Sequence, residues 1–130
     1  MAATTTSKAV DLAIAHCEAW ARQDWEAARQ ALADDVTVLV TTTMPGAPRT
    51  DTTGADDYMV GLEFFASPIV ASSLKVLSNE GDDKNALLHL TVDIDGPPFG
   101  QMTVHSARIY LFDENGKIKD EHVAFYGSPR

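Results

Sequence analysis

The sequence predicts an α+β fold, in which helices pack on one face of a β-sheet. Segments with helical spacing of apolar residues dominate the chain before residue 67, and alternating segments rich in β-branched residues follow. The last two of these segments flank Asn115-Gly116, the strongest short-range signal for a β-hairpin. A chain in which helices come first and sequential antiparallel strands come last is typical of an α+β domain.

The bulk properties fit one domain, residues 7–130, behind a polar tail at 1–6 that we expect to be disordered. The 130 residues are 45% hydrophobic, which is ample for a core. Ten basic residues against nineteen acidic ones argue against nucleic acid and against anionic membrane surfaces as partners. Cys17 is the only cysteine, and no apolar run has the length of a signal core or a membrane span. We therefore expect a cytoplasmic protein.

Two helices are predicted at the start of the chain. Ser7 can cap the first, which runs to about Gln23 with apolar residues on one stripe. Asp24 can cap a second, shorter helix at 25–33. The pair Asp34-Asp35 is expected to end it.

A strand and a third helix follow. Residues 36–43 are rich in β-branched side chains and predict the first strand. Two prolines and a glycine predict a loop at 44–48, whereas 49–53 fit no single assignment. Residues 55–66 have helical spacing, and Ser67-Pro68 ends that helix.

Four strands are predicted in the rest of the chain, at 70–80, 85–94, 104–112 and 118–126. With Asn115 and Gly116 as a two-residue loop, Glu114 lies opposite Lys117 in the last hairpin. Tyr110 then faces Glu121, and Arg108 faces Val123. Because side chains alternate along a strand, one face of this hairpin carries Arg108, Tyr110, Glu121, Val123 and Phe125.

Four short motifs occur in a characteristic order. They are Asp24 opening the second helix, the segment 33–38, Gly54 before the third helix, and the segment 109–118. With the element order α-α-β-α-β-β-β-β, they resemble the NTF2-like superfamily, especially its SnoaL-like and ketosteroid-isomerase-like branches. The resemblance covers nearly the whole chain. It is specific for the fold and not for the activity, because this fold hosts several chemistries.

The resemblance implies a cone-shaped, curved antiparallel or mixed sheet wrapped around three helices, with an apolar pocket at one end. It also implies a homodimer that forms through the outer face of the sheet. That face would carry Ala107, Ile109, Leu111, His122, Ala124 and Tyr126, which are apolar enough for an interface.

The catalytic residues of ketosteroid isomerases do not carry over to this sequence. Their aspartate base falls at about Val40, which cannot abstract a proton. Their two oxyanion donors align with His16 and Arg108. Epoxide hydrolases of this fold place an aspartate two residues after the arginine, where Tyr110 stands here. Any chemistry would therefore rest on a different set of residues.

The candidate pocket combines the hairpin face with residues from two helices. We expect a cofactor-independent enzyme that acts on a small, apolar, carbonyl-bearing metabolite by isomerisation, cyclisation or dehydration. A non-catalytic ligand-binding or sensing module and a dimeric accessory protein are the alternatives. The catalytic candidates are Arg108, Glu121 and His16, and the substrate-binding candidates are Tyr110, Trp20, Phe125, Val123, Val40, Tyr58, Met59 and Leu62.

Each polar candidate also has a structural interpretation. Arg108 and Glu121 can form a salt bridge that only fixes the hairpin, and a lone helical histidine such as His16 is more often a packed or surface residue. No metal or cofactor site is expected, because the spacing of the other histidines matches no known ligand motif. Cys17 lies on an apolar stripe and is expected to be a small buried hydrophobe.

Overall fold

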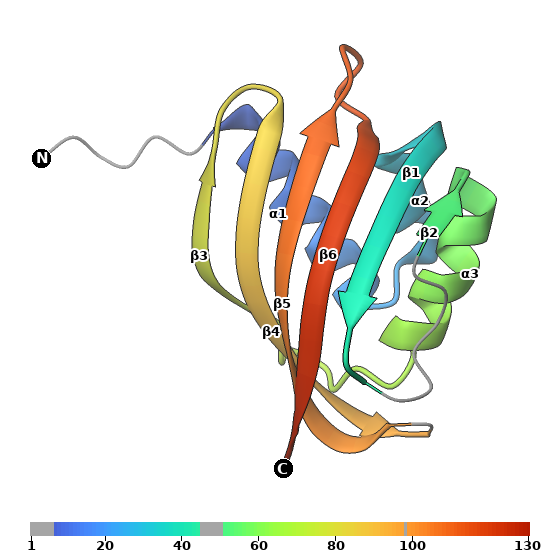
Figure 1. Cartoon of the computed structure of the whole chain (residues 1–130), viewed down its shortest axis with the longest axis vertical. Helices are drawn as coiled ribbons and strands as arrows, with labels where there is room; N and C mark the ends of the chain where they lie inside the picture. The colour runs from blue at the N-terminus through green and yellow to red at the C-terminus, as the bar shows by residue number, and fades with distance from the viewer. Residues whose placement is uncertain (1–6, 45–50, 98) are drawn as a thin grey trace, which may run out of the picture.

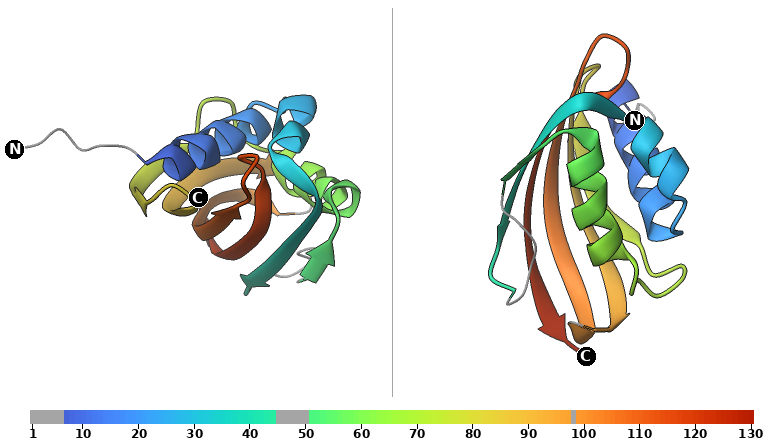
Figure 2. Two further views of the ribbon diagram at one scale, coloured as in Figure 1. Left: turned by 90° about the horizontal axis from the view of Figure 1, so that it is seen from above. Right: turned by 90° about the vertical axis from the view of Figure 1, so that its right-hand side faces the viewer.

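The chain forms one curved sheet with its helices on one face, as the computed structural model shows (Figures 1 and 2). The structure describes residues 7–44, 51–97 and 99–130. The predicted α+β class is therefore confirmed. The predicted tail at 1–6 and most of the predicted loop at 44–48 lie outside the described residues. The elements are α1 (Lys8–Ala21), α2 (Trp25–Gln30), β1 (Leu32–Thr42), β2 (Asp51–Thr53), α3 (Ala55–Ala66), β3 (Lys75–Gly81), β4 (Asn85–Gly96), β5 (Gly100–Phe112) and β6 (Ile118–Pro129).

The six strands form a mixed sheet in the order β2-β1-β6-β5-β4-β3. The β1 and β6 strands run parallel, and all other neighbours are antiparallel. Strands β5 and β6 thus occupy the centre of the sheet, whose concave side faces the helices (Figure 2). Alternate residues of β4 are buried on the inner face of the sheet, and they are Leu88, Leu90, Val92 and Ile94.

The two predicted N-caps are confirmed. The amide of Val10 donates to Ser7 Oγ at 2.9 Å, and the amide of Ala27 donates to Asp24 Oδ1 at 3.1 Å. The predicted end of the second helix is wrong, because α2 stops at Gln30 and β1 begins at Leu32. The amide of Ile118 donates to the carbonyl of Ala31 at 2.8 Å, so the chain joins the sheet directly after the helix. Asp34 and Asp35 consequently lie within β1, where both are exposed.

Two strand boundaries also differ from prediction. Part of the segment that fitted no single assignment forms β2, a short edge strand that pairs with β1. The strand expected from Val70 begins only at Lys75. Ser72 has a φ of 63°, which breaks an extended ladder, and Ser73 Oγ instead accepts from the amide of Asp93 at 3.0 Å. A local backbone turn therefore occupies the residues before β3.

The terminal hairpin has the predicted inward face but a different loop. The amide of Asp113 donates to the carbonyl of Lys117 at 2.8 Å, so three residues, 114–116, form the loop. Gly116 takes a φ of 74°, typical of the three-residue hairpin loop. The predicted pairing of Glu114 with Lys117 is therefore wrong.

A bulge in β6 restores the predicted register beyond the loop. Phe112 pairs with Ile118 and Leu111 with Asp120, which leaves one extra residue in β6 between them. From there the pairings Tyr110–Glu121 and Arg108–Val123 are as predicted. The five hairpin side chains predicted to share a face are all buried on the inner side of the sheet.

Gly54 sets the start of α3 and thereby the position of the residues that follow. Its φ of 101° and ψ of 139° lie in a region that is open essentially to glycine alone. Its amide donates to the carbonyl of Val36 at 2.7 Å, and its carbonyl accepts from the amide of Tyr58 at 3.0 Å. We expect Gly54→Ala to lower the free energy of unfolding by about 1–3 kcal/mol. Urea denaturation measures this, and a change of a few tenths would contradict it.

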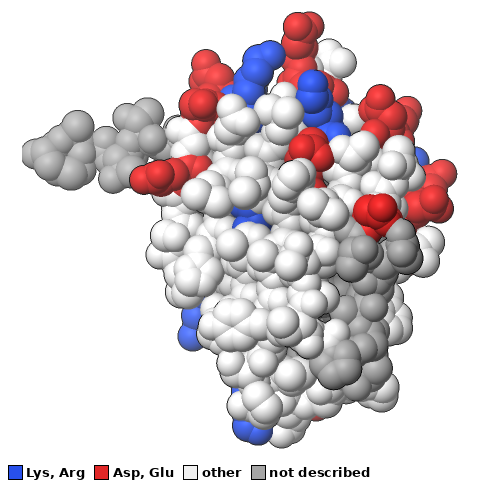
Figure 3. Space-filling model, viewed as in Figure 1, with Lys and Arg blue, Asp and Glu red and all other residues white. Residues whose placement is uncertain are grey.

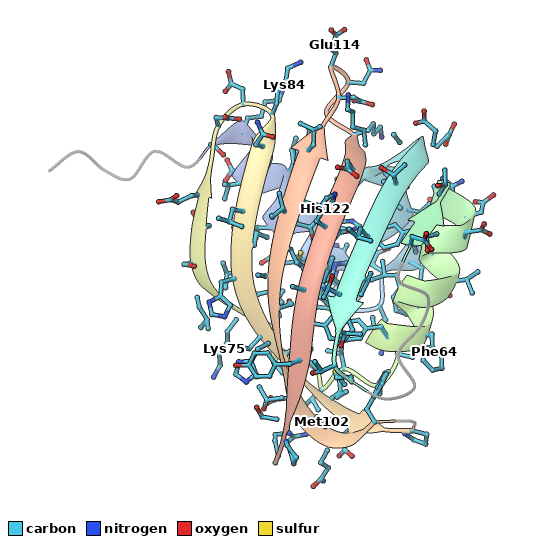
Figure 4. All side chains as sticks on the ribbon, in the orientation of Figure 1. Phe64, Lys75, Lys84, Met102, Glu114 and His122 are labelled. Atoms are coloured by element: carbon cyan, nitrogen blue, oxygen red, sulfur yellow. The ribbon has the colours of Figure 1, made fainter. Side chains whose placement is uncertain are left out.

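The outer face of the sheet is poor in charge at its centre. Figure 3 shows that charged residues gather mainly at the end of the molecule that carries the β3–β4 and β5–β6 turns. Lys84 and Glu114 mark this end, and Met102 lies near the other (Figure 4). Between them, Ile109 and Tyr126 are each 52% exposed. The rings of His105 and Tyr126 stack with centroids 4.6 Å apart.

Candidate functional site

A cavity of about 610 Å³ opens between α3, the two strands β1 and β2, and the central hairpin. Its wall is mostly apolar, and its polar side chains come from three elements, β2, α3 and β5. Such a volume and composition are typical of small-molecule sites. The described lining residues are Val38, Val40, Asp51, Thr52, Thr53, Asp57, Tyr58, Val60, Gly61, Leu62, Phe65, Arg108, Val123 and Phe125.

Arg108 brings a buried cation to this cavity. The side chain is 4% exposed and projects from β5 on the inner face of the sheet. Its Nη1 donates to Glu121 Oε2 at 3.1 Å, and its Nε donates to Ser106 Oγ at 3.1 Å. The guanidinium carbon lies 4.8 Å from the ring centre of Trp20, within cation–π range. Arg108 is thus held on three sides while it lines the cavity.

Glu121 is fully buried and links Arg108 to α3. Its Oε2 accepts from Arg108, and its Oε1 accepts from the hydroxyl of Tyr58. Tyr58 lies on the first full turn of α3 and lines the cavity together with Arg108. The carboxylate therefore sits behind two cavity-lining groups and uses one oxygen for each. A buried ion pair is costly to desolvate, so its presence is weak evidence that it stabilises the fold. This favours a role for Glu121 in positioning Arg108 and Tyr58 at the cavity.

The surroundings keep Arg108 charged and Tyr58 protonated. Burial acts to lower the pKa of Arg108, but Tyr110 and Glu121 beside it outweigh this and raise that pKa above its ordinary value. Burial, together with the negative charge of Glu121, raises the pKa of Tyr58 well above its ordinary value. The cavity wall therefore presents a permanent cation and a neutral phenol.

His16 lies behind the same network and is fully buried on α1. Its ring centre is 6.4 Å from that of Tyr58 and 6.2 Å from that of Tyr110. Within the described chain, neither ring nitrogen makes a hydrogen bond of acceptable geometry, and neither does Trp20 Nε1. Burial lowers the pKa of His16 to about 4, although Glu121 opposes this. His16 is consequently neutral near pH 7.

Tyr110 turns away from the cavity. Its hydroxyl and the Sγ of Cys17 lie 3.2 Å apart in the core between β5 and α1. Burial raises the pKa of Cys17 to about 11, so the thiol is neutral and unreactive. This agrees with the expectation of a buried, structural cysteine.

The cavity brings together six of the eleven candidates from the sequence: Arg108, Tyr58, Leu62, Val40, Val123 and Phe125. The other five do not line it, and they are Glu121, His16, Tyr110, Trp20 and Met59. Sequence reasoning missed the contribution of the edge strand β2, which has no clear strand signal. It also missed Asp57 and Gly61 of α3, although these two are four residues apart and lie directly before Tyr58 and Leu62.

The described residues contain no group of three or more histidine, cysteine, aspartate or glutamate side chains that could hold a metal ion. In the same part of the chain, no helix has the length and apolar character needed to cross a membrane.

The fold is shared with solved structures of low sequence identity. A protein from Kribbella flavida has a TM-score of 0.75 at 24% identity, over 92% of this chain and 88% of that one. An NTF2-like protein of unknown function from Cytophaga hutchinsonii has a TM-score of 0.66 at 18% identity, over 95% and 94%. An LEH-like epoxide hydrolase from M. tuberculosis has a TM-score of 0.68 at 16% identity, over 91% and 82%. No curated protein matches the chain.

A family comparison is more specific. The model of the SnoaL-like domain matches residues 13–121, most of the chain. This span runs from α1 through Glu121 and includes every strand except most of β6. The predicted resemblance is confirmed: the chain shares its fold with an NTF2-like protein and belongs to the SnoaL-like domain family.

Proposed function

We propose that the cavity binds a small, apolar, carbonyl-bearing molecule and that the protein catalyses a proton transfer on it without a cofactor. Isomerisation, cyclisation and dehydration are the reactions of this type. The observation that carries the proposal is Arg108, the only cationic side chain among the described residues that line the cavity. A carbonyl or enolate oxygen is the natural partner of such a cation.

The surroundings of Arg108 support this use. Arg108 Nη2 makes no hydrogen bond to a described residue, which leaves a donor for a ligand oxygen. The wall around it is formed largely by valine, leucine and phenylalanine side chains. In such a low-dielectric site, a fixed positive charge stabilises developing negative charge more strongly than water-exposed groups do. Glu121 and His16 would then act through other residues, because neither lines the cavity.

A non-catalytic ligand-binding module is the second candidate, and one observation favours it. Val40 lines the cavity at the place where ketosteroid isomerases carry their aspartate base. A binder of the same ligand class needs only Arg108 and the apolar wall. A cone filled entirely by its own side chains, as in a purely accessory protein, is poorly compatible with a cavity of about 610 Å³.

The first test uses two matched probes, 2-naphthoate and 2-methylnaphthalene, which differ only in the polar group on the same apolar ring system. We expect 2-naphthoate to bind at least about tenfold more tightly, because only its oxygens can pair with Arg108. Isothermal titration calorimetry gives both affinities. The double variant Arg108→Leu/Glu121→Leu is the control, since it removes both buried charges together. If wild-type protein binds 2-naphthoate and 2-methylnaphthalene with equal affinity, the proposal is wrong.

Catalysis is separated from binding by a second assay. The ketone 2-tetralone carries exchangeable hydrogens next to its carbonyl, and NMR in D₂O follows their replacement by deuterium. We expect wild-type protein to accelerate this exchange and the double variant not to do so. Binding of 2-naphthoate without any acceleration would favour the ligand-binding module instead.

We further propose a cytoplasmic homodimer that forms through the outer face of the sheet. The support is the half-exposed pair Ile109 and Tyr126 on a face with little central charge (Figure 3). We expect Ile109→Lys to weaken the dimer by placing a charge in an apolar interface. Sedimentation equilibrium measures this, with the equally exposed Leu77→Lys, on edge strand β3, as the matched control. A wild-type monomer at all concentrations would refute it.

A further inference from the structure

The proposed function leaves one chemical part unassigned, namely the group that takes the proton from the substrate carbon. Val40 cannot do so, and His16 and Glu121 do not line the cavity. The base must lie close to Arg108, because the carbonyl oxygen and the carbon next to it are only two bonds apart. The cavity-lining polar groups are therefore the candidates.

Tyr58 is the cavity-lining polar group that the structure couples to Arg108. Both side chains line the cavity, and both are bonded to Glu121, one to each carboxylate oxygen. The hydroxyl of Tyr58 donates its hydrogen bond to Glu121 Oε1. The lone pairs of its oxygen therefore remain available to accept from a ligand. A substrate oxygen on Arg108 thus places its neighbouring carbon within the region that Tyr58 borders.

The cavity also contains two carboxylates, Asp51 and Asp57, but both side chains are exposed to solvent. Asp57 precedes Tyr58 in α3, so its side chain leaves the helix about 100° around the axis from that of Tyr58. Water solvates both carboxylates, so neither is enclosed beside Arg108 as Glu121 is. Glu121, in contrast, is fully enclosed, and among the described residues its carboxylate is hydrogen-bonded by Tyr58 and Arg108 alone.

We infer that Tyr58 and Glu121 form a two-step proton relay that serves as the base of this site, an inference that rests on the proposed function. The C–H bond next to the substrate carbonyl breaks, and its proton moves to Tyr58 Oη. In the same step, the hydroxyl proton of Tyr58 moves to Glu121 Oε1. The electron pair of the C–H bond becomes the enolate, whose oxygen is stabilised by Arg108. The reverse transfer delivers a proton to a substrate carbon and restores both residues.

The protonation state of Tyr58 agrees with a relay and not with a free tyrosinate. Because burial and Glu121 raise the pKa of Tyr58, the phenol keeps a proton at neutral pH. It can accept a second proton only if it gives up its own in the same step. Glu121 is therefore the terminal proton holder, and it acts on the substrate through Tyr58 without touching it.

The test is the exchange of 2-tetralone hydrogens in D₂O with Tyr58→Phe, which removes the hydroxyl and keeps the ring. We expect a loss of about 10²-fold or more in the exchange rate at saturating ketone. Binding of 2-naphthoate should persist, because Arg108 remains. Tyr126→Phe is the matched control, because this tyrosine lies on the outer face of the sheet and the same hydroxyl is removed. Its exchange rate should equal that of wild type.

If Tyr58→Phe does not fold, a second variant tests the relay. Glu121→Gln keeps an oxygen that can accept from Tyr58 but cannot take up its proton, so the same loss is expected. Exchange at the wild-type rate in a folded Tyr58→Phe protein would overturn the relay. If Arg108→Leu/Glu121→Leu is then inactive, the proposed function survives that result. Loss of exchange in Asp57→Asn with none in Tyr58→Phe would assign the base to Asp57 and also overturn the relay. Wild-type exchange no faster than that of Tyr58→Phe refutes it as well.

Discussion

Glu121→Ala is expected to lower the free energy of unfolding by about 3–5 kcal/mol, a large part of the 5–15 kcal/mol that stabilises a typical domain. The reason lies in what the substitution leaves behind. Arg108 would stay buried at the inner face with no counter-charge, and Tyr58 would lose the acceptor of its hydroxyl. Urea denaturation followed by circular dichroism measures the loss.

The matched comparison is the double variant Arg108→Leu/Glu121→Leu, which removes both charges and fills the space with apolar side chains. We expect it to be more stable than either single leucine variant, because the penalty of an unpaired buried charge disappears. A Glu121→Ala protein within about 1 kcal/mol of wild type would contradict this, since it would mean that water reaches Arg108 freely.

Acidification is expected to destabilise the protein by about 3 kcal/mol through His16 alone. The pKa of His16 is lowered to about 4 in the folded protein, against an ordinary value of 6.5. At a pH between these two pKa values, His16 is protonated in the unfolded chain and neutral in the folded one. The free energy of unfolding therefore falls as the pH drops from 6.5 to about 4. Above this window the histidine is neutral in both states and contributes nothing.

Urea denaturation at pH 7.5, 5.5 and 4.5 tests this, with His16→Leu as the decisive variant. The acid-induced loss should be smaller in His16→Leu by about the amount assigned to the histidine. His89→Leu is the matched control, because His89 is an exposed histidine on β4. Equal pH dependence in wild type and His16→Leu would show that the ring becomes protonated without unfolding.

Local signals explain which parts of the fold could be predicted. The caps at Ser7 and Asp24 depend on side chains within three residues of the amide they accept from. The inward face of the terminal hairpin follows from alternation around Asn115-Gly116. The loop length did not follow, because a three-residue loop with a later bulge gives the same register. Pairing between β1 and β6 has no local signature, since the two strands are far apart in the chain.

The candidate site shows the same division. Alternation predicts that Arg108 and Glu121 face inward, but not how deep each lies. Depth depends on where α3 packs, and Tyr58 meets Glu121 across 63 residues of sequence. Because Tyr58 covers the carboxylate, Glu121 lies behind the cavity wall and not in it. The sequence named Tyr58 and Glu121 as candidates. It could not predict that Tyr58 would lie between Glu121 and the cavity.

The position of β6 has a consequence for how the chain acquires its structure. This strand is the last in chain order, yet it fills the space between β1 and β5. While the chain emerges from the ribosome, β1 has no long neighbour until β6 follows it. Contacts between such distant segments slow folding and leave strand edges open meanwhile. We therefore expect the apolar inner face of β1 to stay uncovered until β6 has been synthesised, a period in which chaperones would determine the yield of folded protein.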